Sequence, residues 1–196
     1  MLGERSMEFA EARGARVFRL TSGSRNRAAH RQIRRMKFSE SARFSVYEPA
    51  GRRPRPTGGA ARMPSRKQRT VTRLLRQSRE FRLGSGVFWH NFAAASLTKE
   101  VVSNLLSKGA VWRMGEAVAV TRIGGEGEGT WEEICYLGGG VCDSTRLAKA
   151  LLGRAKNVTE RFVFVPQGSP VISGLRREGY ARNFAMILFE RRPANG

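Results

Sequence analysis

The sequence contains no long hydrophobic run. Its longest stretch of consecutive apolar residues, Phe184 to Phe189, has the length of a strand, whereas a membrane-spanning helix needs about 18 or more. The N-terminus carries Glu4, Glu8 and Glu11 and lacks the apolar core of a secretory signal. We therefore expect no membrane span, and we take the cytoplasm as the expected compartment.

Cysteine and acidic residues are also scarce. The two cysteines, Cys135 and Cys142, fit neither a disulfide framework nor a zinc pair. The chain has only 16 acidic residues and 36 basic ones, of which 30 are arginine, so its net charge is +20. Such a field attracts polyanions, including nucleic acid and phosphate-bearing cofactors, and disfavours strongly cationic substrates. A general compositional preference for arginine would give the same excess.

The positive charge is concentrated in the middle of the chain. Residues 1–49, 50–82 and 83–196 carry net charges of +6, +10 and +4. Residues 50–69 combine proline, glycine and arginine with almost nothing to bury, which predicts a linker. We therefore predict three parts, namely a first domain at 1–49, a linker at 50–69 and a second domain at 70–192. Residues 52–82 are a candidate nucleic-acid tether, with a solvated linker as the alternative.

The first region predicts a helix, a strand, a second helix and a second strand. Residues 1–13 have helical periodicity, and residues 16–20 are rich in strand formers. From Arg27 a helix follows, with an apolar seam on one side and a cationic seam on the other. Residues 42–48 then alternate as a half-buried strand. The cationic seam consists of Arg27, Arg31 and Arg34.

The second region predicts a longer alternation of helices and strands. We expect a helix after Thr98, a hairpin formed by residues 117–123 and 131–137, and a buried central strand at 162–165. Between the hairpin and the central strand, Gly138 to Gly140 lead into a helix that we expect Asp143, Ser144 and Thr145 to cap. A helix at 171–177 and a strand at 183–190 close the chain.

The helix and strand near the N-terminus recur near the C-terminus. An offset of 142 residues pairs Phe38 with Tyr180, Ile33 with Leu175 and Glu48 with Glu190. Upstream of the helix the register slips, which predicts a longer turn in the first copy. Chance similarity of two helix–strand units is the alternative.

The first copy resembles the C-terminal half of the GCN5-related N-acetyltransferase (GNAT) superfamily. That half reads as a strand, Thr-Ser, Asn, a small residue three later, and Gly-Phe eleven and twelve after the Asn. Thr21-Ser22, Asn26, Ala29 and Phe38 match these positions, and Lys37 stands where the family prefers glycine. Residues 98–192 resemble a fuller, divergent copy, in which Gly168 occupies the Asn position.

The resemblance implies a mixed α/β fold, a layered sheet flanked by helices, and direct transfer of an acetyl group from acetyl-CoA to an amine. In the family a Gln/Arg-x-x-Gly-x-Gly/Ala turn at a helix N-terminus holds the cofactor pyrophosphate. The resemblance suggests two sets of cofactor contacts, one in each copy. These are Leu20, Thr21, Ser22, Asn26 and Arg27 in the first, and Gly138, Gly139, Gly140, Ser144 and Thr145 in the second.

Departures from the family pattern leave two other functions open. The first copy begins near where its pyrophosphate turn is expected, and residues 138–145 do not fit the turn pattern. The family often places a proton-donating tyrosine where this chain has Ile33 and Leu175. A non-catalytic, partner-binding remnant and a basic nucleic-acid-binding protein are therefore the alternatives to an acetyltransferase.

Other residues have both a functional and a structural interpretation. His30 could titrate near neutral pH or be a surface residue. Glu132 and Glu133 lie where the family sometimes places a general base, although exposed strand charge also explains them. Cys142 near a helix start could act as a nucleophile. Aromatic side chains before the second region could stack on a base or pack in the core; they are Phe88, Trp89 and Phe92.

Overall fold

The computed structural model describes residues 2–51, 58–90, 93–125, 130–152 and 158–192. The helices are α1 (Leu2–Glu11), α2 (Arg27–Arg35), the short η1 (Ser65–Lys67), α3 (Gln68–Gln77), α4 (Arg79–Leu83), α5 (Lys99–Ser107), α6 (Val141–Leu152) and α7 (Val171–Arg177). The strands are β1 (Phe18–Gly23), β2 (Ser39–Pro49), β3 (Ala61–Arg62), β4 (Val87–His90), β5 (Ala93–Ser96), β6 (Val111–Met114), β7 (Ala117–Gly124), β8 (Trp131–Gly138), β9 (Glu160–Pro166) and β10 (Tyr180–Arg191).

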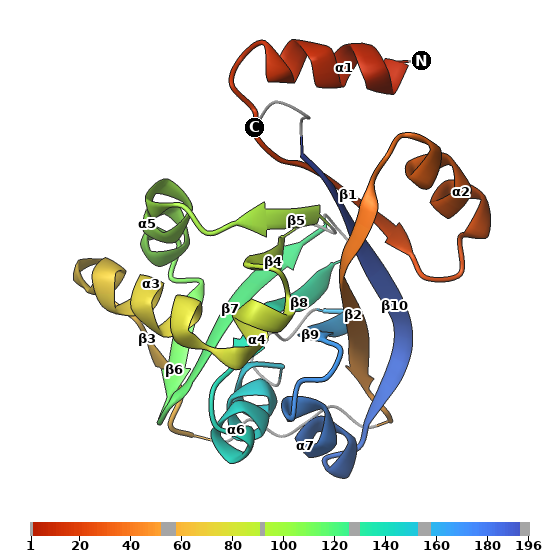
Figure 1. Cartoon of the computed structure of the whole chain (residues 1–196). Coiled ribbons are helices and arrows are strands. Elements are labelled where there is room, and N and C mark those ends of the chain that lie inside the picture. Colours follow the sequence, from red (N-terminus) through yellow and green to blue (C-terminus); the bar gives the residue numbers. More distant parts are fainter. Residues whose placement is uncertain (1, 52–57, 91–92, 126–129, 153–157, 193–196) are drawn as a thin grey trace.

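One mixed sheet organises the molecule (Figure 1). Its eight strands lie in the order β1-β10-β2-β9-β8-β7-β6-β3, and β4 and β5 form a separate hairpin. Neighbours are antiparallel apart from β8 and β9, which are parallel and joined through α6. The predicted mixed α/β class is confirmed, as is the antiparallel hairpin of β7 and β8.

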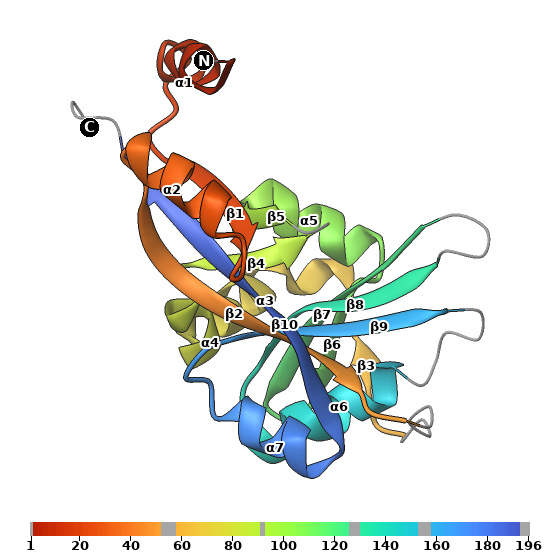
Figure 2. The same cartoon turned by 90° about the vertical axis from the view of Figure 1, so that its right-hand side faces the viewer.

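Helices cover both faces of this sheet (Figures 1 and 2). On one face, α3, α4, α5 and the β4–β5 hairpin bury a core that includes Leu75, Trp89 and Phe164. On the other, α6 and α7 bury a second core that includes Leu147 and Leu175. Helices α1 and α2 enclose a smaller cluster against β10. None of the described helices combines the length and apolarity needed to cross a membrane.

The predicted division at residues 50–69 does not divide the sheet. Strand β2, from the predicted first domain, lies between β9 and β10 of the predicted second domain. Within its 11 residues, Phe44 to Tyr47 are buried on both faces of the sheet, which corrects the predicted half-buried alternation. Removing β2 would expose two strand edges. Within the predicted linker, residues 61–62 form β3, residues 65–67 form η1, and α3 begins at Gln68; residues 52–57 lie outside the described part.

The repeated helix–strand unit is present as α2–β2 and α7–β10. Phe44 lies opposite Met186 in the β2–β10 pair, and these residues are 142 positions apart, the offset of the sequence repeat. Arg43 lies opposite Ile187 and Ser45 opposite Ala185. The two strands are therefore related by an approximate twofold axis that passes between Phe44 and Met186.

The strands of the two units interleave around this axis. Strand β1, which precedes α2, pairs with β10, and β9, which precedes α7, pairs with β2. Leu20 lies opposite Phe189 and Val163 opposite Tyr47, so Leu20 and Val163 occupy equivalent places although they are 143 positions apart. The connection into α2 is therefore one residue longer, as the register slip predicted.

Candidate functional site

Strands β8 and β9 pair at their N-terminal ends and then separate. The parallel pairing runs from Trp131 opposite Glu160 to Ile134 opposite Val163. Beyond it, β8 continues beside β7, and β9 continues beside β2. A register shift lies next to Cys135 in the β7–β8 pair, and such a bulge bends the strand away from its neighbour. The result is an opening between the two central strands that leads to the start of α6.

Side chains of the protein fill this opening. Trp89 is 1% exposed and packs against Phe164 at a ring-centroid distance of 5.4 Å and against Phe44 at 5.2 Å. Ser78 caps α4, and its hydroxyl accepts a hydrogen bond from Tyr136. Burial raises the pKa of the Tyr136 hydroxyl, so it remains a donor.

Glu80 places a carboxylate at the start of α6. It is 2% exposed; one oxygen accepts from the Ser169 hydroxyl at 3.0 Å and the other from the Gly139 amide at 3.4 Å. An amide at a helix N-terminus favours negative charge, and here the chain supplies that charge itself. Glu80 was not among the predicted site residues, although it is the only acid between Glu48 and Glu100.

Two of the three glycines before α6 closely approach other atoms of the protein. A side-chain carbon at Gly138 would lie 2.9 Å from a Glu80 carboxylate oxygen, and one at Gly139 would lie 2.6 Å from the Glu116 carbonyl oxygen. Gly139 also has φ of +118°, which favours glycine. Gly140 has room for a side chain. Two of the three predicted phosphate-binding glycines are therefore explained by the close approach of the protein's own atoms.

The predicted caps of α6 lie inside the helix, which begins at Val141 rather than at Asp143. Asp143 instead accepts from the Glu116 amide at 3.1 Å. The Thr145 hydroxyl donates to the Val141 carbonyl at 2.8 Å. Ser144 is completely buried, and its hydroxyl has no hydrogen-bond partner among the described residues. Neither hydroxyl occupies a cap position at the start of the helix.

The first predicted group lies far from the second. Leu20, Thr21 and Ser22 belong to β1, which is four strands from β8 in the sheet order, or ~19 Å at the usual strand spacing. Asn26 caps α2 by accepting from the Ala29 amide at 3.0 Å. Arg27 is exposed at the start of the helix. The structure does not bring the two predicted groups together.

A cationic groove lies between α2 and the sheet. This α2 groove has a volume of about 370 Å³, and four of its seven lining residues are arginines. The nearby carboxylate of Glu40 pairs with Arg43, which lowers the Glu40 pKa and leaves three guanidinium charges in excess. The lining residues are Ser24, Arg27, His30, Arg31, Arg34, Arg43 and Ile187.

The two adjacent glutamates of β8 are buried, which corrects their interpretation as exposed strand charge. Glu133 is 0% exposed, lies 3.7 Å from Arg122 and accepts from the Cys135 thiol at 3.3 Å. Burial, followed by the Glu133 charge, raises the pKa of the Cys135 thiol well above its usual value. Glu132 points to the opposite face, 3.8 Å from Arg161. Both carboxylates are held by ion pairs inside the protein.

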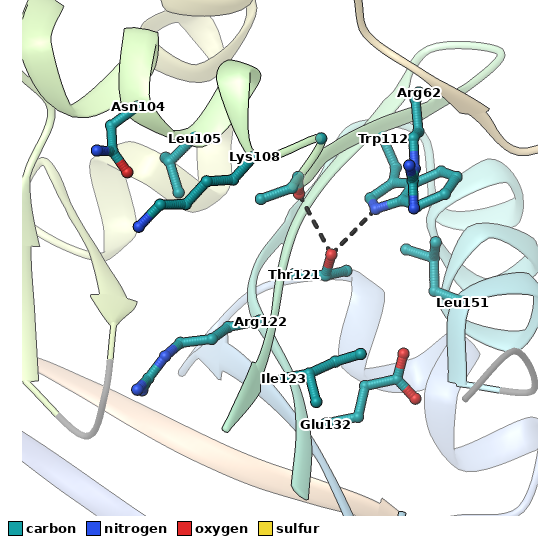
Figure 3. Close-up of a pocket in the computed structure, with 12 residues that line it drawn as sticks. Arg62, Asn104, Leu105, Lys108, Trp112, Thr121, Arg122, Ile123, Glu132 and Leu151 are labelled. Carbon is teal, nitrogen blue, oxygen red and sulfur yellow. Dashed lines mark hydrogen bonds between the residues drawn. The ribbon is translucent and has the colours of Figure 1, made fainter. Parts of the chain in front are cut away.

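A larger cavity, of about 630 Å³, lies at the other end of β8 from the opening. Figure 3 shows Arg62 beside Trp112, whose indole donates to the Thr121 hydroxyl at 3.0 Å, with Lys108 and Arg122 across the cavity. Glu132 is the acid that lines it. This cavity is therefore not located where β8 and β9 separate, although it is larger than the α2 groove.

Solved structures show which fold this is. The GCN5-related N-acetyltransferase of Sphaerobacter thermophilus aligns with a TM-score of 0.59 and 13% identity over 98% of this chain and 67% of its own. That of Anabaena variabilis aligns with a TM-score of 0.57 and 7% identity over 96% of this chain and 48% of its own. The chain has the GNAT fold. No protein-family model and no curated protein sequence matches it.

The chain spans about half to two thirds of the length of these GNAT structures. At such low identity the similarity establishes the fold alone. Ile33 and Leu175, at the two positions where the sequence resemblance suggested a tyrosine, are 7% and 0% exposed. These apolar side chains pack in the core and have no proton to donate.

Of the remaining predicted residues that the structure describes, three are buried and one is exposed. His30 is 8% exposed rather than at the surface; its Nε2 lies 3.0 Å from the Gly23 carbonyl oxygen, and its ring packs against Phe189. Phe88 and Trp89 are core residues, whereas Phe92 lies outside the described residues. Cys142 is exposed in the first turn of α6. Among the described residues, no group of three or more potential metal ligands occurs.

The GNAT fold implies acetyl-CoA, and the two halves differ in how well they suit it. At the β8–α6 turn, Glu80 occupies an amide that a pyrophosphate would need, and its charge would repel one. The turn itself, Gly139 and Gly140, is shorter than the family pattern. The α2 groove offers guanidinium donors with little competing acid. The residues present therefore fit the phosphates of acetyl-CoA at the groove and not at the turn.

Proposed function

We propose that this protein takes part in the transfer of an acetyl group from acetyl-CoA to an amine, and that the α2 groove holds the cofactor phosphates. The observation that carries the proposal is the cluster of Arg27, Arg31, Arg34 and Arg43 around one groove of a GNAT fold. Arginine donates two parallel hydrogen bonds to phosphate, and its charge does not depend on pH in the physiological range.

The positions of Asn26 and Arg27 support this proposal. Asn26 uses its side-chain oxygen to cap α2, and the NH2 group of the same side chain retains two N–H donors that a phosphate could accept from. Arg27 follows at the helix start, where the positive end of the helix dipole also favours an anion. The cofactor supplies the activated thioester, and these residues would orient its phosphates.

A non-catalytic GNAT-fold binding protein is the second candidate. Glu80 closes the opening between β8 and β9, Glu133 is inaccessible to an amine, and neither Ile33 nor Leu175 can protonate a thiolate. These observations favour cofactor or partner binding without turnover. The amine is not identified under either candidate.

The test is binding of acetyl-CoA, measured as a thermal shift and by calorimetry. Ligand at about 100 times its Kd should stabilise the protein by roughly 2.7 kcal/mol. Arg31→Gln combined with Arg34→Gln should weaken binding about 10-fold or more, since each charged hydrogen bond contributes roughly 1.5–3 kcal/mol. Arg69→Gln combined with Arg73→Gln is the matched control and should bind normally.

Two results would separate the candidates. Release of free thiol with a panel of amines supports transfer, whereas binding without thiol release supports the non-catalytic alternative. Absence of a thermal shift at millimolar acetyl-CoA would exclude both forms of the cofactor proposal.

A further inference from the structure

A row of arginines runs along the outer side of α3. Arg69, Arg73 and Arg76 follow one another at spacings of four and three residues, so they share one helical face. All three are exposed. None forms an ion pair with an acid among the described residues. We name these three residues the α3 arginine row.

The residues on either side of the α3 arginine row add to its positive charge. Arg66, Lys67 and Arg79 are exposed on either side of the row. The only acid between Glu48 and Glu100 is Glu80, and it is turned into the protein, where Ser169 and the Gly139 amide bind it. The negative charge of this segment is therefore buried, while its positive charge faces solvent.

Packing fixes the orientation of the row. Val71 and Leu75, on the opposite side of α3, are 0% and 2% exposed in the core. Gln68 donates to the Lys99 carbonyl at 2.6 Å and ties the start of α3 to α5. Figure 1 shows α3 at the outside of its layer, on the side of the sheet away from α6 and α7. The row is held on a rigid element.

The chemistry of the row fits a chain of phosphates. Arg69 and Arg76 are seven residues apart, or ~10 Å along the helix axis, and duplex DNA carries one phosphate charge per ~1.7 Å of its axis. A membrane surface fits less well, because α3 presents no large exposed apolar side chain to insert. The large exposed apolar side chains of the described part are Phe9 and Ile123, on α1 and β7.

We propose that the α3 arginine row, with Arg66, Lys67 and Arg79, binds the phosphate backbone of a nucleic acid without reading its sequence. The site is separate from the α2 groove and does not depend on the acetyl-transfer proposal. It lies within the candidate nucleic-acid tether predicted at 52–82, in the part that forms η1, α3 and α4.

The test is fluorescence anisotropy of the full chain with a labelled single-stranded oligonucleotide at several salt concentrations. The variant Arg69→Gln/Arg73→Gln/Arg76→Gln keeps good helix formers and removes three charges. Each lost phosphate contact lowers the salt slope by about 0.7, so the slope should fall by about 2. Raising the salt concentration from about 50 to 200 mM should therefore lower the affinity of the parent protein roughly 20-fold more than the affinity of the variant.

Exposed arginines of α7 and β10 offer a control outside both proposed phosphate sites. Arg176→Gln/Arg177→Gln/Arg182→Gln removes the same charge from exposed positions, and it should leave the salt slope nearly unchanged. Equal losses in both variants would overturn the proposal in favour of a general effect of net charge. Equal binding of poly-glutamate, or preferential binding to vesicles containing phosphatidylserine, would overturn it in favour of an acidic peptide or a membrane. If the Gln variant unfolds, the corresponding Lys variant must retain the salt slope for the proposal to stand.

Discussion

A single buried carboxylate, that of Glu80, lies beside the central opening of this GNAT fold, at the start of α6. Glu80 lies on the short helix α4 and reaches both the Gly139 amide and the Ser169 hydroxyl. The Glu80 carboxylate is itself the anion that binds the Gly139 amide. The turn before α6 is therefore stabilised without a bound cofactor. The sequence showed Glu80 as an isolated acid among bases, but only packing placed it at the start of α6.

Replacing Glu80 should therefore destabilise the protein. Glu80→Ala leaves a buried hydroxyl and a buried amide without an acceptor, and we expect a loss of about 2–3 kcal/mol in the free energy of unfolding, measured by urea denaturation. Glu80→Gln keeps an acceptor oxygen and should cost less. Glu160→Gln, at an exposed strand position, is the control and should change stability little. A normal unfolding midpoint for Glu80→Ala would contradict the role assigned to Glu80.

At the scale of elements, the two helix–strand units are built alike but begin differently. Helix α2 has a side-chain cap from Asn26, whereas α7 starts after Pro170 without a side-chain cap. Both helices bury an apolar residue at the equivalent position, Ile33 and Leu175. Periodicity predicted the bounds of α7 correctly and the start of α2, since both helices have clear apolar stripes.

The cap of α2 gives a direct test of this difference. Asn26→Ala should cost about 1 kcal/mol of stability, because the Ala29 amide loses its acceptor. Asn26→Ser retains a capping oxygen and should remain close to the parent protein. Urea unfolding followed by circular dichroism measures both variants. If Ser and Ala at this position lower the midpoint equally, the contribution is not capping.

At the scale of the whole molecule, the interleaved strands join the two ends of the chain. Strand β2 bonds to β9 on one side and to β10 on the other, and β10 also bonds to β1. Each unit supplies a strand that covers the edge of the other. Residues 1–49 and 70–192 are therefore held in one sheet despite the stretch of proline, glycine and arginine between them.

Cleaving the chain between these parts should leave it assembled. A specific protease site inserted within residues 52–57 would cut the connection without cutting a described strand. We expect the two fragments to coelute in size-exclusion chromatography and to separate only in denaturant. If they separate in buffer and the larger one keeps the melting temperature of the intact chain, that result would support the predicted division into two domains.

By itself the sequence determined the mixed α/β class and the chain order of the units α2–β2 and α7–β10. These features depend on local periodicity and chain order, which are visible along the sequence. The interleaving of β1, β10, β2 and β9, the burial of Glu133 and the closing of the α6 turn by Glu80 were decided only by tertiary structure. Each of them joins residues distant in sequence, and such pairing depends on which surfaces can be buried together.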